Sequence, residues 1–88
     1  FMVSKKLTLV NPQGFHMRPA SLFASAMGKY SSKITIKFNG NEYNGKSLLN
    51  IMAACIRCGS EIELVCDGAD ESEALAEATQ LIEGGLGD

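Results

Sequence analysis

Apolar and polar residues alternate along three short segments of the chain, and this alternation constrains the fold more than any other feature. The segments are residues 3–10, 33–38 and 61–66. A period of two places successive side chains on opposite faces of a strand, so each segment predicts a strand with one apolar face. Asn39 and Gly40 readily adopt the positive φ angles of a tight hairpin turn, which predicts a short return strand over residues 41–44.

Helical spacing of apolar residues predicts the first two helices. Residues 17–28 place apolar side chains on one stripe, and Gly28 follows as a stop signal. Ser47 is a good N-cap for a second helix that runs to about Cys55. In residues 48–56 only Asn50 is polar. A short helix that is apolar all round cannot bury every side on its own sheet, so part of it is expected to contact something else.

A third helix is predicted near the C-terminus. Asp70 and Glu73 form a variant of the capping box before it, and Gly84 with Gly85 ends it. The Gly-rich end of the chain beyond it is expected to be loose. The resulting order is β-α-β-β-α-β-α. It predicts an α+β fold in which an antiparallel sheet is covered by helices on one side only.

Length and charge limit the classes of function. A chain of 88 residues makes one domain, expected to span residues 2–88, with Phe1 ahead of Met2 as an extra residue. Its net charge of −2 gives no reason to expect nucleic acid or an anionic membrane as partner. No apolar stretch approaches a membrane span or a signal peptide, and three cysteines do not suit a secreted disulfide framework. A cytoplasmic protein is expected.

The most informative stretch is Gly-Phe-His-Met-Arg-Pro-Ala at residues 14–20, where a loop meets the first helix. A helix N-terminus favours an anion, and His16 would lie there. A neutral imidazole nitrogen is a competent nucleophile for phosphorus, while the Arg18 guanidinium suits phosphate oxygens. Pro19 is well tolerated in a first helical turn. A lone histidine at a helix start is often only a cap, so these neighbours carry the functional interpretation.

The same stretch resembles the active-site motif of HPr, the histidine-containing phosphocarrier of the bacterial phosphoenolpyruvate-dependent sugar phosphotransferase system. The resemblance extends over nearly the whole chain. It includes the order of elements, Lys46-Ser47 before the second helix and Gly68-Ala69-Asp70-Glu71 before the third. It implies an open-faced sandwich with strand order 1-4-2-3. It also implies that enzyme I, phosphorylated by phosphoenolpyruvate, transfers its phosphoryl group to Nδ1 of His16, which passes it to a sugar-specific enzyme IIA.

The resemblance also assigns roles to neighbouring residues. Arg18 would stabilise the phosphoryl charge, and the backbone amides of Met17 and Arg18 would face the phosphate. The chain would be a carrier rather than an enzyme, without a cofactor or metal, and would act as a monomer. Met17, Asn50 and Cys55 depart from the commonest family pattern. These departures concern the shape of the docking surface rather than the chemistry.

Ser47 and the second helix suggest regulation and docking. In relatives from low-GC Gram-positive bacteria, the serine at this position is phosphorylated by HPr kinase/phosphorylase, and the modified form binds a catabolite-repression regulator. A plain capping serine is the alternative. An N-cap phosphate would be favoured by the helix dipole and would weaken transfer from enzyme I. The expected surface for enzyme I and enzyme IIA consists of Phe15, Met17, Leu48, Leu49 and Met52.

Two further motifs point to other classes of protein. Residues 40–47 fit the Walker A pattern, but a hairpin explains them better and no parallel sheet is expected. Cys55 and Cys58 form a C-x-x-C pair without a second pair or a spare histidine, so a zinc site is excluded within the chain and a redox role is disfavoured. Two buried thiols and one in a turn are expected instead.

Two other functions remain open. The first is a purely regulatory relative that acts through phosphorylated Ser47 while His16 is idle. The second is a small metabolite-binding or RNA-binding module, which the balanced charge and the lack of an aromatic platform disfavour.

Overall fold

The computed structural model describes residues 2–10, 14–15 and 17–86. The elements follow the predicted order β-α-β-β-α-β-α. The strands and helices are β1 (Met2–Thr8), α1 (Met17–Gly28), β2 (Lys33–Phe38), β3 (Asn41–Asn44), α2 (Leu48–Ala54), β4 (Glu61–Asp67) and α3 (Glu71–Glu83). The first helix and the two strands of the hairpin have the predicted bounds, whereas β1 ends earlier than expected, at Thr8.

The four strands form one antiparallel sheet in the order β1-β4-β2-β3. β4 lies in the centre, where Leu64 is paired with Lys5 of β1 and Ile36 of β2. The tight turn between β2 and β3 has φ of 55° at Asn39 and 81° at Gly40, as the sequence predicts. The α+β class and the strand order 1-4-2-3 are therefore confirmed.

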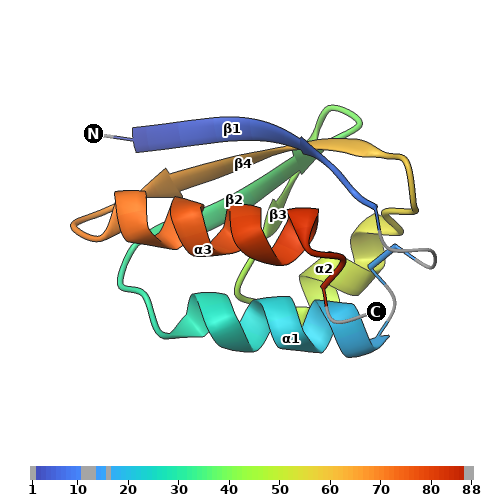
Figure 1. The fold of residues 1–88 in the computed structure, drawn as a ribbon, viewed down its shortest axis with the longest axis horizontal. Coiled ribbons are helices and arrows are strands. Elements are labelled where there is room, and N and C mark those ends of the chain that lie inside the picture. The colour runs from blue at the N-terminus through green and yellow to red at the C-terminus, as the bar shows by residue number, and fades with distance from the viewer. Residues whose placement is uncertain (1, 11–13, 16, 87–88) are drawn as a thin grey trace.

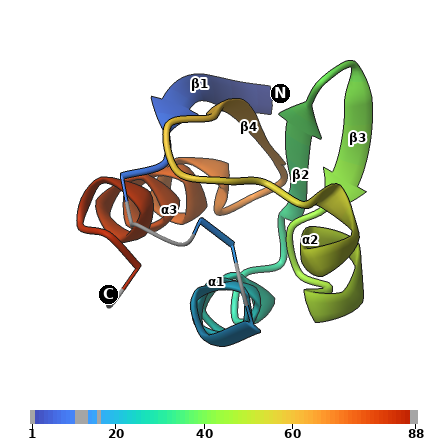
Figure 2. The ribbon, with the colours of Figure 1, turned by 90° about the vertical axis from the view of Figure 1, so that its right-hand side faces the viewer.

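All three helices lie on one face of the sheet (Figure 1). Figure 2 shows α3 under β1 and β4, α2 under β2 and β3, and α1 farthest from the sheet. Inward-facing residues of the strands meet the apolar stripes of the helices, and this burial is the main stabilising contribution to such a small domain. The largest fully buried side chains are Leu9, Phe23, Met27, Ile34, Ile36, Ile51, Ile56, Ile62, Leu64, Ile82 and Leu86.

The expected capping box at Asp70 is wrong. Asp70 is the N-cap of α3 but makes no side-chain cap hydrogen bond. Its carboxylate instead accepts bonds from the backbone N–H groups of Ser31 and Ser32, both at 2.9 Å, and from the Ser32 hydroxyl. The Ser32 hydroxyl and then the Ser31 N–H are the main causes that lower the pKa of Asp70 to about 2. Asp70 thus joins the start of α3 to the turn after α1.

The Gly-rich C-terminal segment is also more ordered than expected. Gly84 ends α3 by donating its backbone N–H to Gln80 at 2.9 Å. The Leu86 N–H donates to the carbonyl of Leu81 at 2.8 Å, and the Leu86 side chain is buried in the core. The prediction of a loose end is therefore wrong as far as Leu86.

Candidate functional site

The loop that leads to the first helix is held against the connection between α2 and β4. Gly14 has φ of +65°, in the left-handed region that favours glycine. A Cβ atom at Gly14 would lie 2.4 Å from the carbonyl oxygen of Ile56 and 2.6 Å from Cα of Arg57. The Phe15 N–H donates a 2.9 Å hydrogen bond to the same Ile56 oxygen. Only a residue without a side chain allows this close approach, which explains the glycine.

The ring of Phe15 anchors the loop in the core. Its side chain is only 4% exposed and packs edge to face on Phe23, with ring centroids 5.5 Å apart. Phe15 was expected to extend the docking surface, and that expectation is wrong for its side chain. The sequence could not show whether this ring is buried or exposed, because its burial depends on contact with Phe23 in the first helix.

His16 lies outside the described residues. On its C-terminal side, α1 begins at Met17 and includes Arg18 and Pro19 in its first turn. Pro19 is buried, while Met17 and Arg18 are exposed. The positive end of the helix dipole is at this turn and favours an anion there. The structure therefore brings together an exposed arginine, a helix N-terminus and an anchored loop, all next to His16 in the chain.

Ser47 is the N-cap of α2, as predicted. Its φ and ψ of −110° and 117° are extended, and its hydroxyl oxygen accepts the Asn50 backbone N–H at 3.3 Å. The side-chain amide of Asn50 donates to the same oxygen at 3.3 Å, and its carbonyl oxygen accepts the Asn44 N–H at 3.5 Å. This role of Asn50 was not predicted from the sequence. Its spacing from Ser47, which matches the N-cap and N3 positions of a capping box, was the available signal.

The predicted docking residues of α2 divide between surface and core. Leu49 is 80% exposed, whereas Leu48 and Met52 are half-buried and pack against the core. On α1, Met17 is 63% exposed. Leu22, also exposed, was missed, although it falls outside the buried stripe of its helix. Exposed apolar side chains therefore occur on both helices, and Leu48 and Met52, which pack partly against the core, lie only at the margin of this exposed set.

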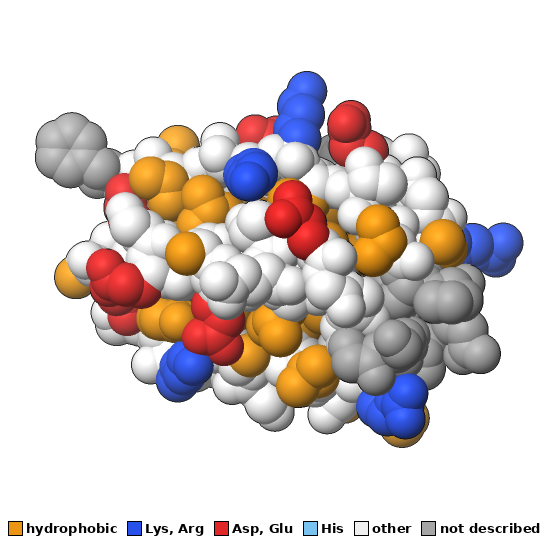
Figure 3. Space-filling model, viewed as in Figure 1, with side chains coloured by type: hydrophobic (Ala, Val, Ile, Leu, Met, Phe, Trp, Pro, Cys, Tyr) orange, Lys and Arg blue, Asp and Glu red, His pale blue; other side chains and the backbone are white. Residues whose placement is uncertain are grey.

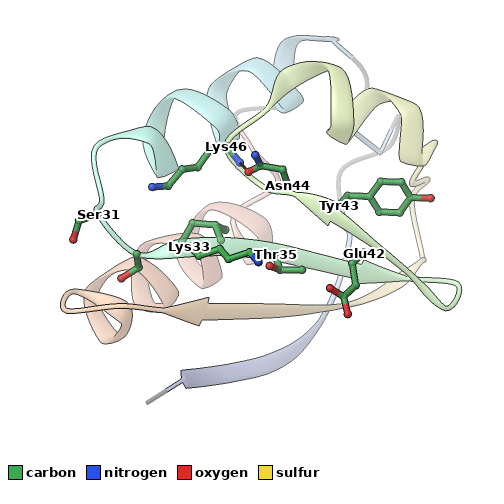
Figure 4. Close-up of a pocket in the computed structure, with 9 residues that line it drawn as sticks. Ser31, Lys33, Thr35, Glu42, Tyr43, Asn44 and Lys46 are labelled. Atoms are coloured by element: carbon green, nitrogen blue, oxygen red, sulfur yellow. Dashed lines mark hydrogen bonds between the residues drawn. The ribbon is translucent and has the colours of Figure 1, made fainter.

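The Walker A pattern forms no P-loop. Residues 40–44 belong to the β2–β3 hairpin, and β3 runs antiparallel to β2. The Lys46 ammonium donates to the carbonyl oxygen of Tyr30 at 2.5 Å rather than facing an anion cradle. Figure 4 shows the adjoining groove of about 430 Å³, whose lining residues include Lys33, Glu42 and Lys46 but none from residues 14–20. The hairpin interpretation holds.

The cysteines differ from expectation. Cys66 is buried, but Cys55 and Cys58 are both exposed, so the prediction of two buried thiols is wrong. Cys55 is the C-cap of α2 in the left-handed conformation, with φ of 55°. Across the part of the chain that the structure describes, no group of three or more His, Cys, Asp or Glu side chains could hold a metal ion.

The described surface carries interspersed charges. The face in Figure 3 shows acidic and basic side chains mixed with small groups of hydrophobic ones. That face carries no extended basic patch, in agreement with the net charge of −2. Of the three described helices, none is both long and apolar enough to cross a membrane.

Comparison with known proteins agrees with this geometry. The family model described as "PTS HPr component phosphorylation site" matches residues 3–84. The Phosphocarrier protein HPr of Treponema pallidum is 39% identical over 82 residues, which cover 93% of each chain. The HPr-C-His structure from Thermoanaerobacter tengcongensis superposes with a TM-score of 0.94 at 32% identity and covers 98% of this chain and 97% of that one.

The name of a third relative refers to catabolite repression. Crh, the Bacillus subtilis catabolite repression protein, forms a domain-swapped dimer and has a TM-score of 0.77 at 28% identity, covering 93% of this chain and 94% of that one. The fold, the loop before α1 and these matches define a small phosphoryl-carrier domain of the phosphotransferase system. The chain belongs to the HPr family of phosphocarrier proteins.

Proposed function

We propose that this phosphocarrier accepts a phosphoryl group from phosphorylated enzyme I on Nδ1 of His16 and donates it to a sugar-specific enzyme IIA. The observation that supports this most is the anchored loop. Gly14 and Phe15 are held on Ile56, and α1 begins immediately after His16. The fold thus fixes the residues on both sides of the histidine in the chain.

The chemistry follows from the neighbouring groups. In its neutral form, the His16 imidazole attacks phosphorus through Nδ1. A P–N bond forms as the bond between phosphorus and the donor breaks. The guanidinium of Arg18 and the backbone amides of Met17 and Arg18, in the first turn of α1, stabilise the charge on the phosphoryl oxygens. The reverse attack by a group on enzyme IIA returns the chain to its starting form, so it acts as a stoichiometric carrier without a cofactor or metal.

The exposed apolar residues of α1 and α2 are proposed as the docking surface for both partners. Met17 and Leu49 form its accessible part, with Leu48 and Met52 at its margin. A transient interface needs apolar residues near the reacting group surrounded by polar ones. We further propose that the chain acts in the cytoplasm as a single-domain monomer and binds neither nucleic acid nor membranes.

The N-cap position of Ser47 favours a second, regulatory role. Ser47 is partly exposed and directly precedes Leu48 and Leu49 in the chain. A phosphate there would place negative charge beside the docking surface and weaken transfer from enzyme I. An HPr kinase/phosphorylase would add it, and a catabolite-repression regulator would bind the product. A purely regulatory protein with an idle His16 is the alternative.

A transfer assay separates these roles. The chain and its His16→Ala variant are incubated with enzyme I and labelled phosphoenolpyruvate, and the acid stability of the label is measured. We expect acid-labile label on the native chain and none on the variant. If the native chain stays unlabelled while enzyme I is phosphorylated, the carrier role is contradicted and the regulatory role remains.

A further inference from the structure

Two exposed thiols flank Ile56 and Arg57, the residues that contact Phe15 and Gly14. Cys55 ends α2 and Cys58 lies in the turn that follows, and both are exposed. Cys66 is buried in β4, and this burial raises the pKa of its thiol. The thiolate is the reactive form of cysteine, so the raised pKa and the burial of Cys66 make it unreactive. The thiols of Cys55 and Cys58 are open to solvent.

The residues between the two thiols are those against which the loop is packed. Ile56 accepts the Phe15 N–H at 2.9 Å, and the backbone of Arg57 lies against Gly14. The distances from a Cβ built on Gly14 show that this packing leaves no room for even a methyl group. A change in the backbone of Ile56 or Arg57 must therefore shift Gly14 and Phe15 or break their contacts.

A second contact joins the same two segments. The Gly59 N–H donates to the Leu9 carbonyl at 2.8 Å, and the Leu9 N–H donates to the Ser60 carbonyl at 3.0 Å. Figures 1 and 2 show the connection between α2 and β4 beside the chain that leaves β1. Hydrogen bonds thus fix the connection on both sides of Cys58. A local change in its backbone is therefore expected to alter these contacts.

The two thiols contact different backbone carbonyls. Cys55 Sγ lies 3.7 Å from the carbonyl oxygen of Met52, and Cys58 Sγ lies 3.9 Å from that of Val10. A disulfide requires sulfur atoms about 2.05 Å apart and Cα atoms about 4.4–6.8 Å apart. When the two sulfurs bond to each other, the chain between them, with Ile56 and Arg57, becomes part of a small covalent ring.

We propose that Cys55 and Cys58 form a reversible dithiol–disulfide site, and that its oxidation moves the Gly14–Phe15 loop. The oxidant is a low-molecular-weight disulfide. The thiolate of one cysteine attacks it, forming a mixed disulfide and releasing one thiol. The second cysteine's thiolate then attacks the protein sulfur of the mixed disulfide and releases the other thiol. Two electrons pass to the oxidant, and the two protons of the protein thiols end on the released thiols.

The consequence for phosphoryl transfer rests on the proposed function of His16. In the reduced protein, the loop is held on Ile56 as described. In the oxidised protein, the Phe15–Ile56 hydrogen bond is weakened and transfer from enzyme I becomes slower. Disulfides in reducing compartments are usually transient and regulatory, which suits a reversible change of this kind.

The test begins with the oxidation itself. The full chain is equilibrated in glutathione/glutathione disulfide buffers, alkylated and analysed by mass spectrometry. We expect a single intramolecular bridge, seen as a loss of about 2 Da from the unalkylated pair. The bridge must persist in Cys66→Ser and be absent from Cys58→Ser. If the native chain yields only glutathione adducts, the proposal is contradicted.

The coupling to the loop is measured separately by NMR, without enzyme I. On oxidation we expect the amide signals of Gly14 and Phe15 to shift and exchange of the Phe15 amide proton to accelerate by about tenfold. An unchanged Gly14 and Phe15 in the bridged protein would contradict the coupling. If the reduced protein accepts no phosphoryl group, the proposed function is contradicted. The bridge and the NMR changes are tested independently of that result, because neither measurement uses enzyme I.

Discussion

The backbone N–H of Phe15 donates a 2.9 Å hydrogen bond to the carbonyl oxygen of Ile56, which joins the loop before His16 to the connection after α2. These two residues are far apart in the sequence, and both side chains are buried. The contact makes the position of the loop depend on the tertiary fold rather than on its own conformational preference. Changes near Ile56 should therefore affect phosphoryl transfer.

Substitution of Gly14 by alanine should damage both stability and transfer. The new Cβ would clash with Ile56, and φ of +65° is unfavourable for alanine. We expect a loss of more than about 2 kcal/mol in the free energy of unfolding. Gly40→Ala is the matched control, because Gly40 also has a positive φ of 81° but no atom within 4 Å of the new Cβ. It should cost about 1 kcal/mol and leave transfer unchanged. Urea unfolding that ranks the two variants equally would contradict the packing argument.

Asp70→Asn should change how stability depends on pH. Hydrogen bonds from Ser32 and Ser31 lower the pKa of Asp70 in the folded protein to about 2, from an ordinary value of 3.8. Because the unfolded chain binds this proton more tightly, the contribution of Asp70 is fully present above its ordinary pKa and is lost as the pH falls through about 2. The native chain should thus exceed the variant in stability at neutral pH, and the difference should shrink in acid. Urea unfolding at a series of pH values measures it, and a pH-independent difference would contradict the assignment.

Ser47→Ala should destabilise α2 because the hydroxyl accepts the Asn50 N–H at its first turn. The expected loss is about 1 kcal/mol in the free energy of unfolding. Asn50→Ala removes only two long side-chain bonds, of 3.3 and 3.5 Å, and should cost less than about 0.5 kcal/mol. Thermal unfolding of both variants checks the order. An equal loss in the two variants would contradict the larger contribution assigned to the serine cap.

Leu49→Ser should weaken docking without affecting the fold. Its side chain is 80% exposed, so the free energy of unfolding should change by less than about 0.5 kcal/mol. If Leu49 contacts enzyme I, affinity should fall by about tenfold, as for a moderately important interface residue. Lys37→Ser, on the exposed face of β2, is the control and should leave affinity unchanged. Titration calorimetry with enzyme I compares the three proteins, and equal affinities would remove Leu49 from the docking surface.

Much of the fold was predictable because its signals are local. The alternation in residues 33–38 and the Asn39–Gly40 pair fix a hairpin by themselves. Likewise, the serine before α2 caps its own helix. The capping role of Asp70 was predicted wrongly because its carboxylate accepts hydrogen bonds from Ser31 and Ser32, which precede it by more than thirty-five positions. A local capping motif cannot reveal such a competing long-range contact.

The site was predictable in its chemistry but not in its packing. The residue types around His16 and Arg18 indicate an anion at a helix N-terminus, whatever the rest of the chain does. Phe15, by contrast, has a buried ring because it packs on Phe23 within the core. The exposure of Cys55 and Cys58 depends in the same way on how the connection between α2 and β4 crosses the surface. Neither outcome is encoded in a local pattern.

The most direct test of the carrier function is to locate the phosphoryl group on the chain. After incubation with enzyme I and labelled phosphoenolpyruvate, nitrogen-15 and phosphorus-31 NMR identify the bonded imidazole nitrogen. We expect an acid-labile P–N bond at Nδ1 of His16, and none in His16→Ala. Label on any other residue, or an equal level of label on the variant, would contradict it.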